Sequence, residues 1–384
     1  MSKIRAVTPI PCRFERAEPY LGATETASEA DYFLRPPYRA LYSRYYETTF
    51  VRIESDEGQV GWGECLAPVS PRVSAAIIED ILGPTLIGMD PLATSYLRSH
   101  LYDLMRDRGY FGGFFVDAIT ACDIALWDLK GKQLGESITG LIGGPFRERV
   151  PCYVSGIGQT NDEDRMAYAE GWAKRRFRRF KHAGGYGVDA DAETVRRLFA
   201  GLGEDIVVGL DGHWAYPPPE AERLGVRLAE LGETFFEAPI NPEDVGTHAR
   251  LANKLTVPVA SGEALRTRHE FRTWLTSAAV DIAQPDVGRA GITETLAIAS
   301  MAETFSVPVA PHLSVQLGPV IAASIHVAAS IPNLYLLEFQ PPTVELANRF
   351  LYEGIEVEAG EYVIPDGHGL GIEVNEERIR ELQV

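Results

Sequence analysis

The stretch from Lys181 to Glu338 repeats one pattern, an apolar run followed by a polar residue able to do chemistry, as in IVVGLDGH (206–213) and VPVAPH (307–312). In chain order, the residues that end these runs are Lys181, Asp211 with His213, Glu237, Glu263, Asp286, His312 and Glu338. From Asp211 onward the successive ends lie 26, 26, 23, 26 and 26 residues apart. A strand, a loop and a helix need about that many residues, so each step predicts one βα unit. Repeated βα units with functional groups at the strand ends are typical of a TIM-type barrel, whose active site lies at the C-terminal face.

The residues before this stretch predict a second, smaller region with antiparallel strands. Alternating side chains in ETTFVRIESDEGQVGWGE (47–64) favour a hairpin that turns at Asp56-Glu57-Gly58. Apolar residues recur at helical spacing in FVDAITACDIALWDLKGK (115–132), which predicts a buried helix leading into the barrel.

Residues 20–46 form a long segment rich in tyrosine, arginine and proline. A loop of that length inside a compact domain is usually functional or disordered. Two interpretations stay open, a lid over a ligand or a solvated surface loop. The residues that favour the lid are Tyr20, Tyr32, Arg35, Arg39 and Tyr45.

The composition suits a globular chain with a barrel and one smaller domain. Of its 384 residues, 45% are hydrophobic and 23% are charged. A formal net charge of −18 argues against nucleic acid or an anionic membrane as partner, because both need a basic surface.

The most apolar region, 307–337, is interrupted by polar residues, and the N-terminus lacks a signal-peptide core, so no membrane span is expected. The four widely spaced cysteines favour reduced thiols in a cytoplasmic enzyme over a zinc site or a disulfide framework.

Three acids, Asp211, Glu237 and Glu263, end three consecutive runs and are the candidate metal ligands. Carboxylates gathered at one end of a barrel would repel one another without compensation. A hard divalent cation resolves the repulsion, and an all-oxygen ligand set suits Mg²⁺. The alternative is a set of surface acids at strand ends, but three acids in register favour the metal.

Two candidate bases lie on different runs. His312 and Asp286 end neighbouring strands, so Asp286 could bond one ring nitrogen and orient the other toward a substrate. Lys181 ends an earlier strand, and near another cation and a metal its ammonium form would be disfavoured, so that it could act as a base. Arg179, two residues earlier, faces the same way on that strand and suits a carboxylate. The alternatives are a structural histidine and a basic surface run, RRFRRFK (175–181).

Two further polar residues belong to the same set of strand ends. His213, two residues past Asp211, should point into the same site, either as a general acid or as a hydrogen-bond partner of the metal shell. Glu338, on the last run, could bond a substrate carboxylate if it is protonated.

With these residues the chain resembles the mandelate racemase subgroup of the enolase superfamily over nearly its whole length. The segments that carry the resemblance are DIALWDLKGK (123–132), the strand of Lys181, LDGH (210–213), EAP (237–239), GE (262–263), QPDVGRAGITE (284–294), PH (311–312) and GLGIEVNE (369–376). The resemblance implies an α/β fold, a modified TIM barrel, (β/α)₇β, with an α+β N-terminal capping domain completed by the C-terminal tail. Residues 1–125 would form the capping domain with its lid, 126–345 the barrel, and 346–384 the segment that completes the cap. It also implies one essential Mg²⁺, and members of the family are commonly homo-oligomers.

The resemblance gives each candidate residue a role. Asp211, Glu237 and Glu263 match the metal ligands, His312 and Asp286 the His–Asp dyad, Lys181 the second lysine of the Lys-x-Lys motif, and Glu338 the last-strand glutamate that supports the substrate carboxylate. Two positions depart from the usual pattern. Arg179 replaces the first lysine of the motif. His213 stands where racemases of the subgroup usually have asparagine, and it resembles the galactonate dehydratase branch, in which a histidine there is the general acid.

The resemblance, together with His213, implies a dehydratase of an acid sugar, either an aldonate or an aldarate. Lys181 or His312 would remove the proton α to the substrate carboxylate, depending on the configuration of that carbon, and Mg²⁺ would stabilise the enediolate. His312 or His213 would then protonate the leaving β-hydroxyl, which gives a 2-keto-3-deoxy acid.

Three alternatives stay open. A racemase or epimerase needs bases on both faces of an enediolate, which Lys181 and His312 would supply. A cycloisomerase is less favoured, because that branch typically has lysines on opposing strands and no dyad histidine. A ligand-binding relative without catalysis would lack a base or a metal ligand, and none is missing here. The sequence does not determine which acid sugar is the substrate, or whether it carries one carboxylate or two.

Overall fold

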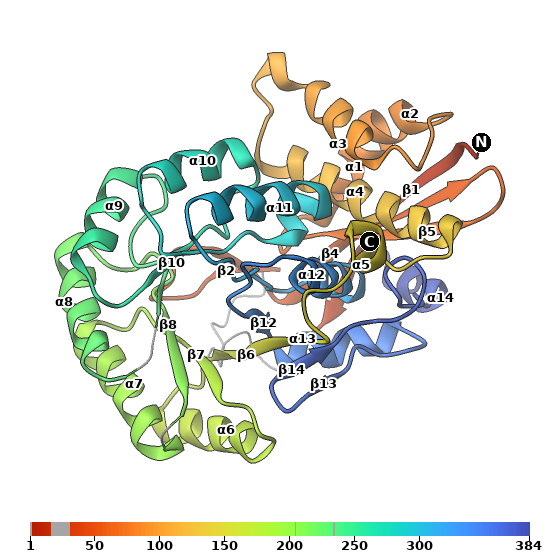
Figure 1. The fold of residues 1–384 in the computed structure, drawn as a ribbon. Helices are drawn as coiled ribbons and strands as arrows, with labels where there is room; N and C mark the ends of the chain where they lie inside the picture. Colours follow the sequence, from red (N-terminus) through yellow and green to blue (C-terminus); the bar gives the residue numbers. More distant parts are fainter. Residues whose placement is uncertain (1, 17–30, 204, 233–234) are drawn as a thin grey trace.

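The computed structural model describes residues 2–16, 31–203, 205–232 and 235–384 of the chain. An N-terminal α+β region, red to gold in Figure 1, packs beside a barrel-like α/β region, green to blue. No helix among these residues has both the length and the apolar character that crossing a membrane needs.

The N-terminal region is built on an antiparallel sheet. Its strands, in spatial order, are β1 (Ile4–Glu15), β4 (Tyr45–Ser55) and β5 (Val60–Cys65). The predicted hairpin is confirmed, since β4 pairs with β5 and Gly58, at φ 84°, donates its N–H to the Ser55 carbonyl at 3.0 Å. A second hairpin, β2 (Tyr32–Leu34) with β3 (Leu41–Ser43), lies in the segment expected to be a lid, whereas Tyr20 falls outside the described residues.

One long helix joins this sheet to the barrel. The helices of the region are α1 (Pro71–Ile77), a π-helical turn (Ile78–Leu82), α2 (Gly83–Leu86), α3 (Thr94–Asp103), a 3₁₀ turn (Arg106–Arg108), α4 (Gly113–Leu134) and α5 (Ile138–Ile142). Helix α4 is the predicted buried helix, and it lies close against β5 at two glycines. A Cβ atom on Gly61 or Gly63 would lie 2.1 or 2.0 Å from a backbone carbonyl oxygen of α4. The expected domain boundary at residue 125 falls inside this continuous helix, which also packs against α11 (Val287–Thr304).

The barrel strands run parallel, in the order that the 26-residue period predicts. They are β6 (Arg149–Ile157), β7 (Arg179–Ala183), β8 (Val207–Asp211), β9 (Phe236–Glu237), β10 (Val259–Ser261), β11 (Ile282–Ala283) and β12 (Leu337–Phe339). Single parallel bridges carry the order from β11 to Val309 and from Val309 to Leu334, just before β12, and β12 pairs with β6. The run VPVAPH (307–312) therefore takes the place of the seventh of eight barrel strands, although it pairs with its neighbours only through isolated bridges.

A helix follows each of the first seven positions, which confirms the (β/α)₇β order. These helices are α6 (Asp162–Lys174), α7 (Val188–Leu202), α8 (Pro218–Ala229), α9 (Val245–Lys254), α10 (Arg268–Thr276), α11 and α12 (Gly318–Ser330), and α13 (Pro341–Ala347) follows β12. They lie outside the strands in Figure 1. Alternate strand residues pack against them, while the others form a small interior cluster that includes Tyr153, Phe235 and Ile282. The barrel interior is therefore filled by side chains, which leaves its C-terminal end open for a site.

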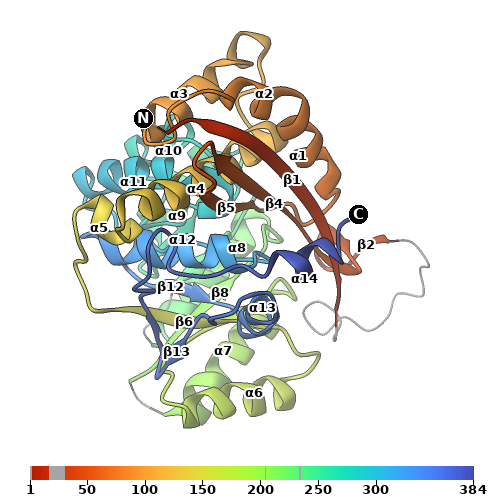
Figure 2. The same cartoon turned by 90° about the vertical axis from the view of Figure 1, so that its right-hand side faces the viewer.

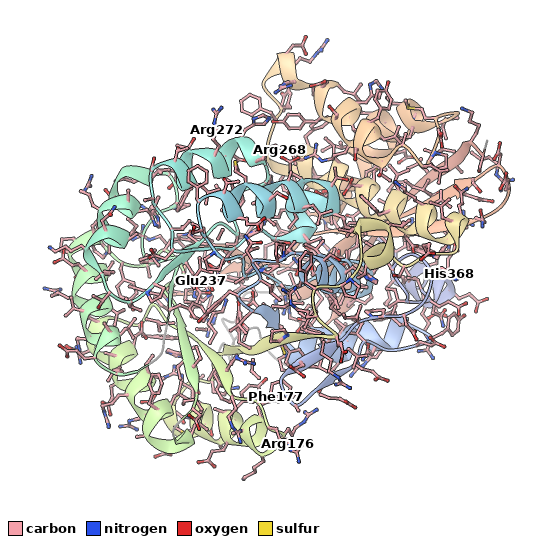
Figure 3. The ribbon with its side chains drawn as sticks, in the orientation of Figure 1. Arg176, Phe177, Glu237, Arg268, Arg272 and His368 are labelled. Carbon is pink, nitrogen blue, oxygen red and sulfur yellow. The ribbon has the colours of Figure 1, made fainter. Side chains whose placement is uncertain are left out.

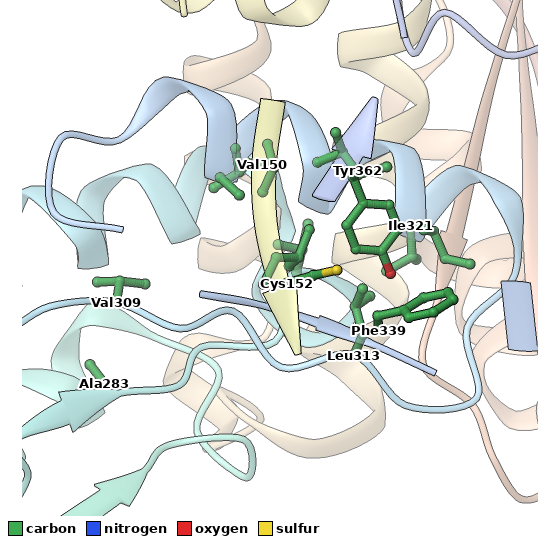
Figure 4. Close-up of a cluster of buried hydrophobic side chains, with 14 of the residues drawn as sticks. Val150, Cys152, Ala283, Val309, Leu313, Ile321, Phe339 and Tyr362 are labelled. Atoms are coloured by element: carbon green, nitrogen blue, oxygen red, sulfur yellow. The ribbon is translucent and has the colours of Figure 1, made fainter. Parts of the chain in front are cut away.

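The C-terminal tail returns across the barrel to the N-terminal region, as predicted. It contains a 3₁₀ turn (Asn348–Phe350), β13 (Val357–Glu358), β14 (Glu361–Val363) and α14 (Glu376–Arg380). Strand β14 pairs antiparallel with β6, and its Tyr362 donates its hydroxyl hydrogen to the Glu338 carbonyl at 2.9 Å within the cluster of Figure 4. The last residues then reach β1, where the Val384 N–H bonds Pro11 O at 2.9 Å, and Figure 2 shows this end beside β1.

Candidate active site

A cavity of about 190 Å³ lies where the C-terminal ends of the barrel strands meet the N-terminal region. Residues 40–43 of the expected lid and Leu66 and Pro68 after β5 form part of its wall. The predicted site residues that line it are Lys181, Asp211, His213, Glu263, His312 and Glu338. Glu237 and Asp286 lie directly behind them, almost fully buried. Figure 3 shows Glu237 in the interior of the barrel, enclosed by the outer helices.

Lys181 lies between two carboxylates. Its Nζ is 2.9 Å from both oxygens of Glu237, 3.0 Å from Glu338 Oε1 and 4.0 Å from Asp211 Oδ2. Burial alone would lower the pKa of Lys181, but the surrounding carboxylates outweigh it and raise this pKa well above its usual value. In this arrangement Lys181 is an ammonium ion.

The predicted dyad is present. His312 Nδ1 is 2.6 Å from Asp286 Oδ2, and His312 Nε2 is 2.9 Å from Glu263 Oε2. The Asp286 carboxylate is fixed by Gln316 Nε2, at 2.9 and 2.8 Å from its two oxygens, and by the Gly288 N–H at 2.7 Å. Burial opposes protonation of His312, yet Glu263, Glu338 and Asp286 raise its pKa well above the usual value. The ring is therefore held by Asp286 as an imidazolium that faces the cavity.

The acids differ in how well their charge is compensated. Burial raises the pKa of Asp211 and of Glu237 to about 7 in each case, despite the ammonium group of Lys181. Burial is also the largest single influence on Glu263, but the charge and hydrogen bond of His312, together with the charge of Lys181, outweigh it and lower the pKa to about 2. The site thus holds more negative charge than its two cations neutralise.

These carboxylates fit a hard divalent cation. Glu237, Glu263 and His312 offer ligand atoms that all lie within 4.8 Å of one another. The Asp211 carboxylate is not part of that set; it accepts the His213 N–H at 2.9 Å and lies 3.3 Å from His213 Nε2. The three acids lie at the ends of consecutive strands, and they supply the negative charge and oxygen donors that Mg²⁺ prefers. The chemistry of the donor set therefore agrees with a metal site.

His213 is held by the N-terminal region. The Tyr38 ring lies on its imidazole, with ring centroids 4.3 Å apart at an interplanar angle of 33°. Burial lowers the pKa of His213 to about 4, so it is neutral near pH 7. His213 and Trp214 have φ values of 46° and 54°, in the left-handed region that side chains other than glycine rarely adopt. Such backbone strain is typical of functional loops.

The last-strand glutamate is fixed as an ion. Glu338 Oε2 accepts the Leu313 N–H at 2.9 Å, and Oε1 contacts Lys181. Burial would raise the pKa of Glu338, but Lys181 and His312 lower it below the usual value. Glu338 therefore acts here as an acceptor for cations, whereas the sequence suggested a protonated donor.

Arg179 is the one predicted site residue that neither lines the cavity nor contacts a residue that does. Arg179 is the first residue of β7 and pairs with Val207, the first residue of β8. Val207 packs on the interior cluster of the barrel. Two residues along a strand span about 6.6 Å. Arg179 therefore lies one layer below Lys181 although both face the same way.

Sequence reasoning missed several supporting residues. Gln284 donates to Glu237 Oε2 at 2.6 Å, and Gln316 fixes Asp286. Gln284 directly follows β11 and is two residues before Asp286, so the alternation of side chains in an extended segment could have found it. Tyr38 and Gln316 carried no such signal, because each reaches the site from a loop.

A barrel with an N-terminal domain over its strand ends, and a ring of acids facing a lysine and a histidine, defines an enzyme of the enolase type. Residues 164–378 match the family described as enolase C-terminal domain-like. Residues 33–143 match the N-terminal domain of mandelate racemase and muconate lactonizing enzyme. The chain belongs to the mandelate racemase subgroup of the enolase superfamily.

Several relatives align over most of the chain. A D-galactarolactone cycloisomerase of Agrobacterium fabrum is 36% identical, covering 87% of this chain and 90% of its own. An arabinonate dehydratase of Saccharolobus solfataricus is 33% identical, covering 86% and 89%. A D-galactonate dehydratase of Pectobacterium atrosepticum is also 33% identical, covering 86% and 90%. The chain is therefore an enzyme, and the dehydratases among its relatives place it with the lyases.

Solved structures share the fold of the chain. A member of the enolase superfamily from Agrobacterium tumefaciens has a TM-score of 0.94 at 34% identity, covering 99% of this chain and 98% of its own. A racemase of Streptomyces coelicolor with bound magnesium shares the fold, at a TM-score of 0.87 and 23% identity, covering 99% and 100%.

Proposed function

We propose that the chain is a Mg²⁺-dependent dehydratase of an acid sugar, which removes the proton α to the carboxylate and eliminates the β-hydroxyl as water. The observation that carries this proposal is the position of Lys181 and His312. Both line the same cavity from different strand positions, and each contacts a carboxylate of the candidate metal site, Lys181 that of Glu237 and His312 that of Glu263. The dehydratase relatives support the same reaction class.

Asp211, Glu237 and Glu263 would hold the metal. When bound, Mg²⁺ would neutralise the carboxylates that keep Lys181 and His312 protonated, and would stabilise negative charge that develops on the substrate carboxylate. Gln284 fixes the orientation of Glu237, and His213 that of Asp211, through the hydrogen bonds described above.

The chain's own groups then move two protons. Lys181 Nζ or His312 Nε2 takes the α-proton, according to the face on which that hydrogen lies. The C–O bond at the β-carbon breaks, a protonated group gives a proton to the leaving oxygen, and the resulting enol becomes a 2-keto-3-deoxy acid. His312 or His213 gives this proton; the hydrogen bond of His312 Nδ1 to Asp286, which is not a metal ligand, favours His312.

Two other reactions share the first step. The cycloisomerase relative, at 36% identity, makes a lactone a second candidate substrate, in which the leaving oxygen belongs to the ring. Racemisation is the third candidate, because bases on both sides of the α-carbon are what a 1,1-proton transfer needs.

Proton NMR in D₂O tests the three candidates together. The enzyme is incubated with Mg²⁺ and with aldonates, aldarates and their lactones, and each mixture is followed with time. A 2-keto-3-deoxy product from an open-chain acid supports dehydration, and the same product formed only from a lactone moves the function to cycloisomerase. Deuterium at the α-carbon with an epimer and no keto product would replace both with a racemase.

A further inference from the structure

The cavity contains a positive charge that the elimination does not use. Arg289 lies in the first turn of α11, three residues after Asp286, and its side chain lines the cavity. Its Nε is buried without a hydrogen-bond partner, and within the described part of the chain no residue supplies a hydrogen bond or ion pair to its guanidinium group. A buried donor without a partner is costly, so a donor left open in a cavity wall indicates a ligand.

One acid near Arg289, Asp117, is already hydrogen-bonded to another arginine. The charge of Arg289 acts on Asp117 at the start of α4, whose carboxyl group is buried. Asp117 already accepts two hydrogen bonds from Arg266, at 2.8 Å from Nε and 3.0 Å from Nη2. One carboxylate facing two guanidinium groups leaves a net positive charge at Arg289.

Arg289 lies across the cavity from Lys181 and closer to the N-terminal region. Strands β7 and β11 are four places apart in the ring of eight, so they are on opposite sides of the barrel. The backbone around Arg289 is bonded to the N-terminal region, since Gly288 O accepts the Leu66 N–H at 2.9 Å and Arg289 O accepts the Thr120 hydroxyl at 2.8 Å. A second guanidinium, that of Arg16, lines the same cavity and lies 3.9 Å from the centroid of the Tyr46 ring.

We propose that Arg289 binds the second carboxylate of a dicarboxylic acid sugar, so that the substrate is an aldarate and not an aldonate. The proposal rests on the proposed function, in which the reacting carboxylate lies at the candidate metal site of Asp211, Glu237 and Glu263. The planar fork of an arginine matches a carboxylate in two parallel hydrogen bonds. An aldonate would put a neutral hydroxymethyl group against the same guanidinium and leave it unpaired.

Matched pairs of acids test the proposal, because an aldonate and its aldarate differ at one terminal carbon. Galactonate and galactarate, gluconate and glucarate, and mannonate and mannarate are compared for binding by calorimetry and for turnover by NMR, with Mg²⁺ present. We expect the aldarate of at least one pair to bind about 10- to 100-fold more tightly, the range expected for one hydrogen-bonded ion pair. Arg289→Met should remove this preference, and Arg289→Lys should retain part of it.

The matched control is Arg272→Met, on the outer face of α10, where Figure 3 shows the side chain at the periphery. This variant should keep the preference of the parent enzyme. Equal binding of aldonates and aldarates, or an undiminished preference in folded Arg289→Met, would overturn the proposal and leave the dehydratase assignment standing. A diacid preference that depends on Arg289, without turnover or α-deuteration of any acid, would support the diacid site and overturn the proposed reaction.

Discussion

The ring of Tyr38 in the N-terminal region packs on the imidazole of His213 in the barrel, with ring centroids 4.3 Å apart and an interplanar angle of 33°. The two residues belong to different structural regions, and the contact couples the expected lid segment to the residue that follows the Asp211 strand. The Tyr38 hydroxyl also donates to Ala183 O at 3.4 Å, at the end of the Lys181 strand. The catalytic cavity is therefore completed only when the N-terminal region is docked.

Tyr38→Ala should lower kcat while changing KM little, because the ring contact positions His213 and Tyr38 does not line the cavity. An aromatic stack is worth about 0.5–1.5 kcal/mol, which corresponds to a loss of about 2- to 13-fold. Tyr38→Phe keeps the ring and is the control, with near-normal kcat expected. Steady-state kinetics on both variants checks this, and an equal loss in both would attribute the effect to the hydroxyl group instead.

Lys181→Met and His312→Asn should each reduce kcat by about 10²- to 10⁴-fold, the contribution expected of a general acid or base. The two roles separate in D₂O. The variant that lacks the base should also lose α-proton exchange, whereas the variant that lacks the acid should exchange the α-proton and fail to eliminate. Lys174→Met, on the exposed end of α6, serves as the control for the charge change. Near-normal turnover in both active-site variants would disprove the assignment.

Mg²⁺ should stabilise the protein more at pH 8 than at pH 5. Asp211 and Glu237 have pKa values raised to about 7 in the folded, metal-free chain, against about 3.9 and 4.3 when unfolded. The folded state thus keeps protons that the unfolded state releases, so the free energy of unfolding falls as the pH rises from about 4 to about 7. The depressed pKa of Glu263 acts only below this window.

At pH 8 both carboxylates are free to bind the metal, while at pH 5 protons compete with it. Free Mg²⁺ at 100 times its Kd adds about 2.7 kcal/mol to the free energy of unfolding. Thermal unfolding of desalted protein with and without Mg²⁺ at the two pH values measures the difference. Asp211→Asn is the control and should show a smaller shift; equal shifts at both pH values would contradict a site made of these carboxylates.

Gly63→Ala should destabilise the chain, because a Cβ atom there would lie 2.0 Å from Ala121 O in α4 and the helix would have to move. Overpacking of this kind costs about 1–3 kcal/mol. Gly171→Ala provides a control of opposite sign, since a Cβ atom on this exposed helical glycine would point into open space, with no packed neighbour within 4 Å. Replacing such a glycine stabilises by about 0.4–1 kcal/mol. Thermal unfolding of the two variants should therefore shift in opposite directions.

The sequence by itself determined the barrel and the residues at its strand ends. Regular spacing from Asp211 to Glu338 follows from the length of a βα unit, and parallel strands necessarily bring their C-terminal ends to one side. The candidate metal ligands, Lys181 and the His312–Asp286 pair could be named for that reason. Local alternation likewise predicted the β4–β5 hairpin, and helical spacing predicted α4.

Only the tertiary structure decided how these groups act on one another. Whether Lys181 is charged depends on the distances to Glu237 and Glu338, residues that are far apart in the sequence. The same holds for Arg179, whose place one layer below the cavity depends on strand register, and for Tyr38, which reaches His213 from another region. Arg289 shows the difference most clearly: the sequence places a guanidinium after Asp286, and the folded chain alone shows that no described acid bonds to it, because Asp117 is already bound to Arg266.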